Sequence, residues 1–382
     1  MSEDLLLIPG PVTVSKDVLK AQSIQSLSHT HPKFISIFQS VLKNLRVLFK
    51  STNPKDQGIV ISGSGTLGWD ITGSNLVYPD DDVLVLSTGF FSDKFAKALE
   101  VYDANVDILT APVGGINSLQ EVETQLKKKK YSVITITHVD TSTAVTQNLA
   151  NLSKIIKKVS PESLIVIDGV CSVAVEDIEF TKWGLDYVLT GSQKAIGIPP
   201  GLSIGFISER AIEKALKRPK QSTYFASLPL WLPILQNYEA GKPSYFATPS
   251  IQLINALKVS LDEILNGGLE ERFIKSKRVA QDFKKRLTNE LGLQLVSLDN
   301  EYSASGLTGV YFPEGINGPD FLNSAYKRGV VFAGGIHTAI QPKYFRVGHM
   351  GVSALDDSLG HIEKAFDVIK ESLAELGYKK IE

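Results

Sequence analysis

A carboxylate and an amine near the middle of the chain could act together. Asp168 follows the apolar run 164–167, and Lys194 comes shortly after a second apolar run, 187–189. A carboxylate at the end of so apolar a strand is costly to bury without a cationic partner. Taken singly, Asp168 could cap a helix and Lys194 could be an ordinary surface lysine. Together they favour a ligand crevice, because an open α/β sheet binds its ligands at strand ends.

A glycine-rich loop adds a candidate phosphate site. Residues 63–68 read Gly-Ser-Gly-Thr-Leu-Gly, after the apolar run 59–62 and before a helical pattern. Such a loop directs free backbone N–H groups and the positive end of a helix at an anion. The spacing also satisfies the dinucleotide pattern, which needs an acidic residue at the end of the next strand to hold a ribose. That strand, 83–86, is followed by Ser-Thr-Gly at 87–89. The loop therefore favours a phosphate cofactor without a ribose, and a plain tight turn stays the other interpretation.

Lysine, carboxylate and phosphate loop together match the needs of pyridoxal 5′-phosphate. This cofactor requires a lysine for its Schiff base and an acid for its pyridinium nitrogen. Lys194 and Asp168 would supply these two groups. A NAD-dependent oxidoreductase would rest on the glycine loop alone, and a non-catalytic binding protein would leave the lysine and carboxylate unexplained.

Short apolar runs alternate with helical patterns over residues 20–255. Runs as continuous as these suit strands buried on both faces, as in parallel sheets. The alternation predicts an open α/β sheet with helices around it. The predicted strands are 59–62, 83–86, 133–136, 164–167, 187–189 and 203–207, with helices such as 91–101, 119–129 and 149–158 between them.

The pattern changes after Pro249. Residues 250–290 predict one or two long helices, with a break at the Asn-Gly-Gly of 266–268. We therefore expect an N-terminal segment (1–20), a large cofactor-binding domain (21–255) and a smaller α+β C-terminal domain (256–382). In that last domain we predict strands at 293–298, 309–312, 330–332 and 344–348, and a final helix over 355–376.

Composition and charge exclude several classes of protein. The 382 residues include 40 basic and 41 acidic ones, and this balance excludes a global electrostatic surface for nucleic acid. The chain has no apolar run of about 18 residues, so we expect no membrane helix. One cysteine excludes a disulfide framework and a cysteine metal cluster. His29 and His31 have strand-like spacing but no evident third ligand, so we expect no metal site.

The N-terminus lacks a clear targeting signal. Glu3 and Asp4 come early, and the first arginine is Arg46. A secretory signal begins with basic residues, and a mitochondrial one is rich in arginine and poor in acids. We therefore expect a cytoplasmic protein, with mitochondria as the alternative.

Several motifs resemble those of the class V, fold-type I pyridoxal-phosphate aminotransferases, over nearly the whole chain. The resemblance is greatest to the fungal members of the alanine–glyoxylate and serine–pyruvate branch. It implies a mostly parallel seven-stranded sheet flanked by helices, a smaller α+β C-terminal domain and a homodimer with shared active sites. The motifs are Pro9–Pro11, Ser62–Thr66, Thr137–His138, Thr141–Thr143, Val166–Val170, Gly191–Ala195, Tyr245 with Thr248, and Phe345–Gly348.

The resemblance also implies a role for each matching residue. Lys194 would hold the cofactor and then shuttle a proton, while Asp168 would keep the ring nitrogen protonated. Phe91 would stack on one ring face and Val170 would pack against the other. Arg346 would bind the substrate carboxylate through a bidentate pair. Further cofactor contacts would come from Ser64, Gly65, Thr66, Thr141 and Gln193, and, across the dimer, from Tyr245 and Thr248.

The activity implied is transfer of the amino group of L-alanine to glyoxylate, giving pyruvate and glycine by a ping-pong mechanism. Glycine formation is the favoured direction in this family. Serine–pyruvate and related small amino acid–glyoxylate activities stay open as alternatives. A cysteine desulfurase of the same superfamily would need a catalytic cysteine on a flexible loop, whereas Cys171 follows the Asp168 strand directly.

Two positions depart from the family pattern. Animal members commonly carry His where Thr66 stands and Trp where Phe91 stands. Thr66 keeps its backbone N–H, and Phe91 keeps a stacking face but loses area and an indole donor. Trp69, on the helix after the glycine loop, is expected to fill core. For residues 334–337, both a mobile loop over the substrate and a simple hairpin turn stay open.

Overall fold

The large unit of the protein is built on a seven-stranded sheet. In the computed structural model, which describes residues 4–380, the strand order is β2-β10-β9-β8-β5-β3-β4. Only β10 runs antiparallel to its neighbours, so the sheet is mostly parallel, as predicted. The strands are β2 (Gln57–Ser62), β3 (Asp82–Ser87), β4 (Asn105–Thr110), β5 (Val133–Thr137), β8 (Leu164–Asp168), β9 (Tyr187–Gly191) and β10 (Leu202–Ile207).

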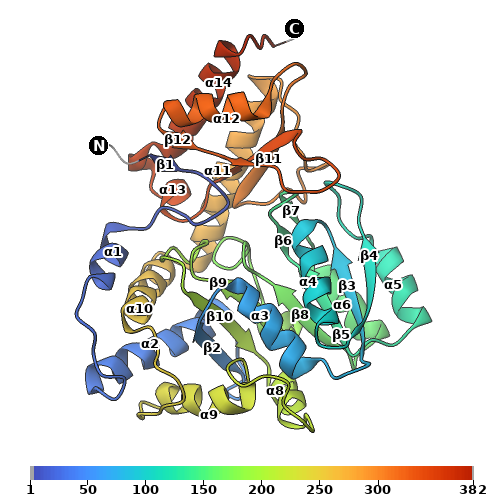
Figure 1. The fold of residues 1–382 in the computed structure, drawn as a ribbon, viewed down its shortest axis with the longest axis vertical. Helices are drawn as coiled ribbons and strands as arrows, with labels where there is room; N and C mark the ends of the chain where they lie inside the picture. The colour runs from blue at the N-terminus through green and yellow to red at the C-terminus, as the bar shows by residue number, and fades with distance from the viewer. Residues whose placement is uncertain (1–3, 381–382) are drawn as a thin grey trace.

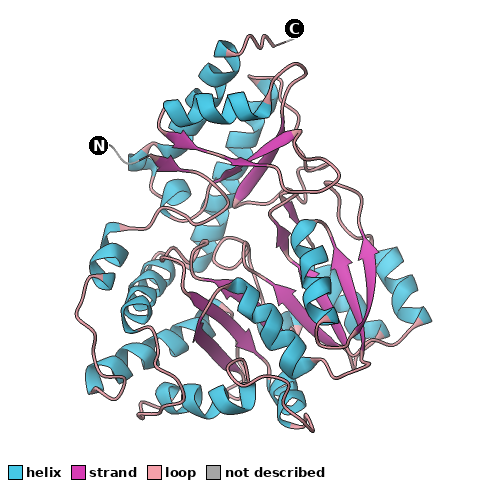
Figure 2. Ribbon diagram, viewed as in Figure 1, coloured by secondary structure: helices cyan, strands magenta, loops and turns pink. Residues whose placement is uncertain are grey.

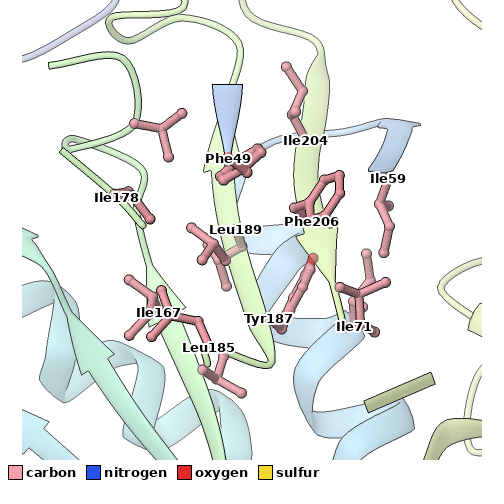
Figure 3. Packing of buried hydrophobic residues seen from close by; sticks show 14 of the residues in the cluster. Phe49, Ile59, Ile71, Ile167, Ile178, Leu185, Tyr187, Leu189, Ile204 and Phe206 are labelled. Atoms are coloured by element: carbon pink, nitrogen blue, oxygen red, sulfur yellow. The ribbon is translucent and has the colours of Figure 1, made fainter. Parts of the chain in front are cut away.

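Helices cover both faces of this sheet (Figure 2). Every residue of β5, β8, β9 and β10 is buried, which requires packing on both sides. Figure 3 shows part of the resulting core, in which Phe206 of β10 lies among the side chains of Phe49 and Ile59. The helices of this unit are α1 (Lys16–Gln22), α2 (Pro32–Leu48), α3 (Gly65–Ile71), α4 (Phe90–Glu100), α5 (Leu119–Lys128), α6 (Leu149–Val159), α7 (Phe180–Trp183), α8 (Glu209–Leu216), α9 (Leu228–Glu239) and α10 (Ile251–Asn266).

Segments from both ends of the chain meet in the smaller unit (Figure 1). Their buried residues form the unit's own hydrophobic cluster. Its antiparallel sheet has the order β11-β14-β13, and β1 pairs with β12 in parallel beside it. The N-terminal strand therefore belongs to this unit. We retain the division into domains at residues 20 and 255 as a prediction. The elements are β1 (Leu5–Leu6), α11 (Leu269–Asn289), β11 (Leu307–Tyr311), α12 (Gly318–Lys327), β12 (Val330–Val331), β13 (Ala333–Gly334), β14 (Tyr344–Gly348), α13 (Val352–Leu355) and α14 (His361–Glu375).

Two long helices join the units, and the predicted break between them is confirmed. α10 ends at Asn266 and α11 begins at Leu269. Gly268 has φ +79, a left-handed conformation that side-chain-bearing residues rarely adopt. The chain can therefore change direction at this position.

Some elements differ from the predictions. Residues 293–298 form no strand and make a single bridge, Leu295 to Val310. The last helix begins at His361 rather than 355, because Gly360 at φ +61 separates it from the short helices before it. β4 had no predicted counterpart, since this edge strand is partly exposed and the adjacent apolar pair Ile108 and Leu109 interrupts its alternation.

Across residues 4–380, no helix combines the length and apolar character needed to cross a bilayer. Within the same described residues, no group of three His, Cys, Asp or Glu side chains could hold a metal ion. His31 instead caps α2, where its Nδ1 accepts a hydrogen bond of 3.1 Å from the backbone N–H of Lys33.

Candidate active site

Nine of the predicted site residues line one cavity of about 140 Å³. It lies where β2, β8 and β9 end and the loops after them begin. This is the crevice that an open α/β sheet offers to ligands. The nine residues are Ser64, Gly65, Thr66, Phe91, Thr141, Asp168, Val170, Gln193 and Lys194, and the cavity is completed by Trp69, Thr137, Val139 and Cys171.

The glycine loop ends in the first turn of α3, as predicted. Ser64 is the N-cap in an extended conformation, and its side chain makes no capping hydrogen bond. The N–H groups of Gly65 and Thr66 lie in the first turn, where a helix offers no internal acceptor. A Cβ on Gly65 would lie 2.6 Å from Cγ2 of Val170, so only glycine brings the helix this close. The first turn thus presents free donors to the cavity.

Asp168, the last residue of β8, is buried in the cavity wall. Its Oδ2 accepts a hydrogen bond of 2.9 Å from Nε1 of Trp69, and its Oδ1 accepts one of 3.0 Å from the N–H of Val170. Burial raises the pKa of Asp168 to about 6, while these two hydrogen bonds oppose the shift. None of the ion pairs within residues 4–380 includes this carboxylate. Its buried negative charge therefore lacks a protein cation in direct contact.

Lys194 reaches the same cavity from the loop between β9 and β10. Its Nζ donates a hydrogen bond to the carbonyl oxygen of Pro9, in the N-terminal segment. Gly10 makes room for this contact, since a Cβ there would lie 2.5 Å from Cδ of Lys194. The loop itself is held by Ser192, whose Oγ donates to the carbonyl of Pro199 at 2.8 Å. The lysine amine is therefore positioned by residues far apart in the sequence.

The start of α4 places Phe91 at the cavity through a buried carboxylate. Asp140 is fully buried, and its Oδ2 accepts hydrogen bonds of 3.1 Å from the N–H groups of Phe91 and Ser92. Its Oδ1 accepts from the N–H and hydroxyl of Ser142, at 2.9 and 2.7 Å. One side chain thus fixes both the phenylalanine and the turn that carries Thr141.

Arg346 lies behind Thr141, outside the set of residues that line the cavity. It belongs to β14 of the smaller unit and is 8% exposed. Its Nε donates to the carbonyl of Gly334 at 2.9 Å, and its Nη1 donates to that of Thr141 at 3.3 Å. Burial lowers the pKa of Arg346, although a guanidinium stays charged at neutral pH. The arginine is held without a carboxylate partner among residues 4–380.

Comparison with known proteins identifies the family. The sequence profile of the aminotransferase class-V family matches residues 16–366. The chain is a class-V aminotransferase. The family resemblance seen in the motifs is thereby confirmed.

Several relatives of this class-V aminotransferase are named as glyoxylate aminotransferases. It is 48% identical to alanine–glyoxylate aminotransferase 1 of Saccharomyces cerevisiae, over 97% of this chain and 98% of that one. It is 29% identical to serine–glyoxylate aminotransferase of Arabidopsis thaliana, over 91% and 85% of the two chains. The crystal structure of alanine–glyoxylate aminotransferase from Nostoc superposes with a TM-score of 0.89, at 27% identity over 98% and 96%.

Two predicted site residues of this aminotransferase lie away from the cavity of their own chain. Tyr245 is 58% exposed, and its hydroxyl is 3.5 Å from Oγ1 of Thr248. The Tyr245 ring contacts that of His29, with centroids 4.7 Å apart. Their expected role across a dimer stays a prediction.

Two contacts in the aminotransferase site were missed from the sequence. Trp69 was expected to fill core, and its ring does stack on Phe95 at 5.4 Å, but its indole nitrogen also binds Asp168. The contact of Pro9 with Lys194 had no expected counterpart either. For Trp69, its position directly after the glycine loop, four residues beyond the start of α3, was the available signal. Pro9 contributes a backbone carbonyl, which every residue type carries, so its residue type offered no signal.

Proposed function

We propose that this class-V aminotransferase moves the amino group of L-alanine to glyoxylate, giving pyruvate and glycine by a ping-pong mechanism. The observation that carries the proposal is the 48% identity to the yeast alanine–glyoxylate aminotransferase 1, along nearly the full length of both chains. Serine is a second candidate amino donor, supported by the similarity to the Arabidopsis serine–glyoxylate aminotransferase.

We propose that pyridoxal 5′-phosphate binds in the cavity, and three features of the cavity fit it. The carboxylate of Asp168 is buried without a cationic side chain beside it, and a protonated ring nitrogen would supply the missing positive charge. Oε1 of Gln193 and Oγ1 of Thr137 are buried without hydrogen-bond partners in the described chain. The first turn of α3 offers free N–H groups to a phosphate. When bound, the cofactor supplies an aldehyde that condenses with amines and a ring that withdraws electrons.

Lys194 and Asp168 would do the proton chemistry. The amine of Lys194 would hold the cofactor. Once released, it would take the proton from the α-carbon of L-alanine in one half-reaction and deliver a proton to the α-carbon of the new glycine in the other. General acid–base catalysis of this kind contributes about 10² to 10⁴-fold. Asp168 would hold a proton on the ring nitrogen, a preorganised electrostatic interaction. Both groups line the same cavity, which supports this assignment.

The remaining cavity residues, together with Arg346, would bind and orient the cofactor and the substrate. Phe91 and Val170 would pack against the two faces of the ring, and Arg346 would bind the substrate carboxylate with the donors that Gly334 and Thr141 leave free. The phosphate and the rest of the cofactor would be bound by Ser64, Gly65, Thr66, Gln193 and Thr141.

We further propose a homodimer in which Tyr245 and Thr248 reach the active site of the partner subunit. Support comes from exposed aromatic side chains near these residues: Tyr224 is 76% exposed and Phe225 is 43% exposed. Tyr224 contacts Phe246, the neighbour of Tyr245, with ring centroids 5.4 Å apart. Exposed aromatic residues gathered in this way are typical of interaction surfaces.

An array of substrates tests the activity. We would measure kcat/KM for L-alanine, L-serine and L-aspartate as donors with glyoxylate as the acceptor, and for L-serine and L-aspartate also with pyruvate. The proposal expects alanine with glyoxylate to be the best pair, with the parallel double-reciprocal plots of a ping-pong mechanism. A purified holoenzyme should be yellow, and borohydride should remove its visible band and label Lys194. A colourless protein that takes up no pyridoxal phosphate would overturn the assignment.

A complementation experiment tests the shared site. Lys194→Ala should abolish turnover, and the double variant Tyr245→Ala, Thr248→Ala should bind the cofactor weakly. In a hybrid dimer of the two variants, one site would combine an intact Lys194 with an intact Tyr245 and Thr248. Mixing and refolding the two proteins should therefore restore activity. Mixtures as inactive as their components would contradict a site built from two subunits.

A further inference from the structure

The hydroxyl of Tyr344 joins the 335–337 loop to the turn that carries Thr141, a residue of the candidate active site. It donates a hydrogen bond of 2.6 Å to the carbonyl of Ser142, in the turn that carries Thr141. It also accepts hydrogen bonds from the N–H groups of Ile336 and His337, at 3.0 and 2.9 Å. Tyr344 is fully buried, and burial raises the pKa of its hydroxyl, which therefore stays protonated and able to donate.

The 335–337 loop is shaped to lie on the Tyr344 ring. A Cβ on Gly335 would lie 2.3 Å from Cε1 of this ring, so the close approach requires glycine. The N–H of Gly335 donates to the carbonyl of Tyr344 at 2.9 Å. The segment is therefore held by three hydrogen bonds from its backbone to one tyrosine.

Both anchors of Arg346 adjoin residues that Tyr344 holds. The carbonyl that accepts from Nε belongs to Gly334, next to Gly335. The carbonyl that accepts from Nη1 belongs to Thr141, next to Ser142. Arg346 itself lies two positions beyond Tyr344 on β14, on the same face of the strand. Tyr344 thus sets the distance between the two supports of the guanidinium.

We propose that Tyr344 is a positioning residue, whose hydroxyl fastens the 335–337 loop to the 140–143 turn and so orients Arg346 toward the substrate carboxylate. The inference rests on the proposed function, because it concerns the binding of amino and oxo acids. It predicts that loss of the hydroxyl acts on substrate binding in both half-reactions, since L-alanine and glyoxylate both carry a carboxylate. The chemistry at Lys194 would be affected much less.

The test compares Tyr344→Phe with a matched control. Tyr311→Phe is the control, because Tyr311 lies opposite Tyr344 in the β11–β14 register and its hydroxyl makes no hydrogen bond within residues 4–380. Tyr344→Phe should raise KM for L-alanine and glyoxylate about tenfold each, with kcat changed less than about twofold. Tyr311→Phe should leave both constants as in the wild type. KM values within about twofold of wild type in Tyr344→Phe, or a loss confined to kcat, would overturn the proposal.

Amide hydrogen exchange gives a readout independent of turnover. The N–H groups of Ile336 and His337 should exchange faster in Tyr344→Phe than in wild type or Tyr311→Phe, because they lose their acceptor. Gly335→Ala should have the same effect by a second route, since its Cβ displaces the ring. Unchanged exchange at both amides would overturn the proposed link between the 335–337 loop and the 140–143 turn, even if KM changed. A wild-type enzyme inactive with alanine and glyoxylate would refute the proposed function. The exchange result would still decide whether the Tyr344 hydroxyl links the 335–337 loop to the 140–143 turn.

Discussion

The indole of Trp69 and the carboxylate of Asp168 form a buried hydrogen bond of 2.9 Å between α3 and β8. The same helix begins at Gly65, four residues before Trp69, with the free N–H groups of the glycine loop. One helix would therefore serve both ends of the proposed cofactor. Its first turn would bind the phosphate, and its tryptophan binds the carboxylate proposed to pair with the ring nitrogen.

Replacing Trp69 by phenylalanine should raise the pKa of Asp168 further. A hydrogen bond to a charged group contributes about 1.5 to 3 kcal/mol, which corresponds to a shift of about one to two pKa units. A neutral Asp168 would pair only weakly with the protonated ring nitrogen. The affinity for pyridoxal phosphate should therefore begin to fall at a pH about one unit higher than in the wild type. Cofactor affinity measured against pH checks this. Trp231→Phe is the control, because the indole of Trp231 donates to the carbonyl of Phe225 instead. This variant should leave the pH dependence of cofactor affinity unchanged.

Asp168 should make the stability of the apoprotein depend on pH. Its pKa is raised to about 6 in the folded chain, above the ordinary value of about 3.9 expected when unfolded. The folded state therefore holds the proton more tightly. The stability that this proton provides is present below about pH 4 and is lost as the pH rises through about 6.

The variant Asp168→Asn removes this dependence. The free energy of unfolding of wild-type apoprotein, relative to that of the variant, should fall by about 2 kcal/mol between about pH 4 and pH 7. Urea unfolding of both apoproteins at several pH values measures the difference. A difference that stays constant with pH would mean that burial does not raise the pKa of this carboxyl.

Gly10→Ala should disturb Lys194. The new Cβ would lie 2.5 Å from Cδ of the lysine, and the backbone at φ +95 disfavours any side chain. Displacing a catalytic group by an ångström costs about a hundredfold in rate, so kcat should fall by about that factor. Gly315→Ala is the matched control, since Gly315 has φ +83 with open space around it. It should lose stability but keep kcat, and an equal loss of kcat in both variants would argue against the contact.

Arg346→Lys should weaken binding of both substrates. Lysine keeps the charge but loses the planar fork, and it cannot donate to Gly334, Thr141 and a carboxylate in fixed directions. KM for L-alanine and glyoxylate should rise about ten- to hundredfold, with a smaller change in kcat. Steady-state kinetics with each substrate varied in turn measures this. A variant with unaltered KM for both substrates would remove Arg346 from the carboxylate site.

Residues that stand at a recognisable place in a local sequence pattern, such as the end of an apolar strand, could be predicted before the fold was known. Asp168 and Lys194 follow buried apolar strands, and the sheet that those strands predict is confirmed. The break at Gly268 was equally visible, because a glycine pair between two helical patterns is a local signal. The edge strand β4 escaped prediction because it is partly exposed and only partly alternating. Residues 293–298 were predicted as a strand but form only the bridge at Leu295.

The amino-acid sequence by itself determined the chemistry on offer: an amine, a buried carboxylate and a phosphate loop, each at the end of a predictable element. Only the tertiary structure decided which groups hold these in place. Trp69 and Asp168 are 99 positions apart, Lys194 and Pro9 are 185 apart, and Tyr344 and Ser142 are 202 apart. Periodicity reports which face of an element is buried, but a contact between distant segments depends on how whole units pack. For that reason the tyrosine proposed to orient the substrate arginine could be found only in the folded chain.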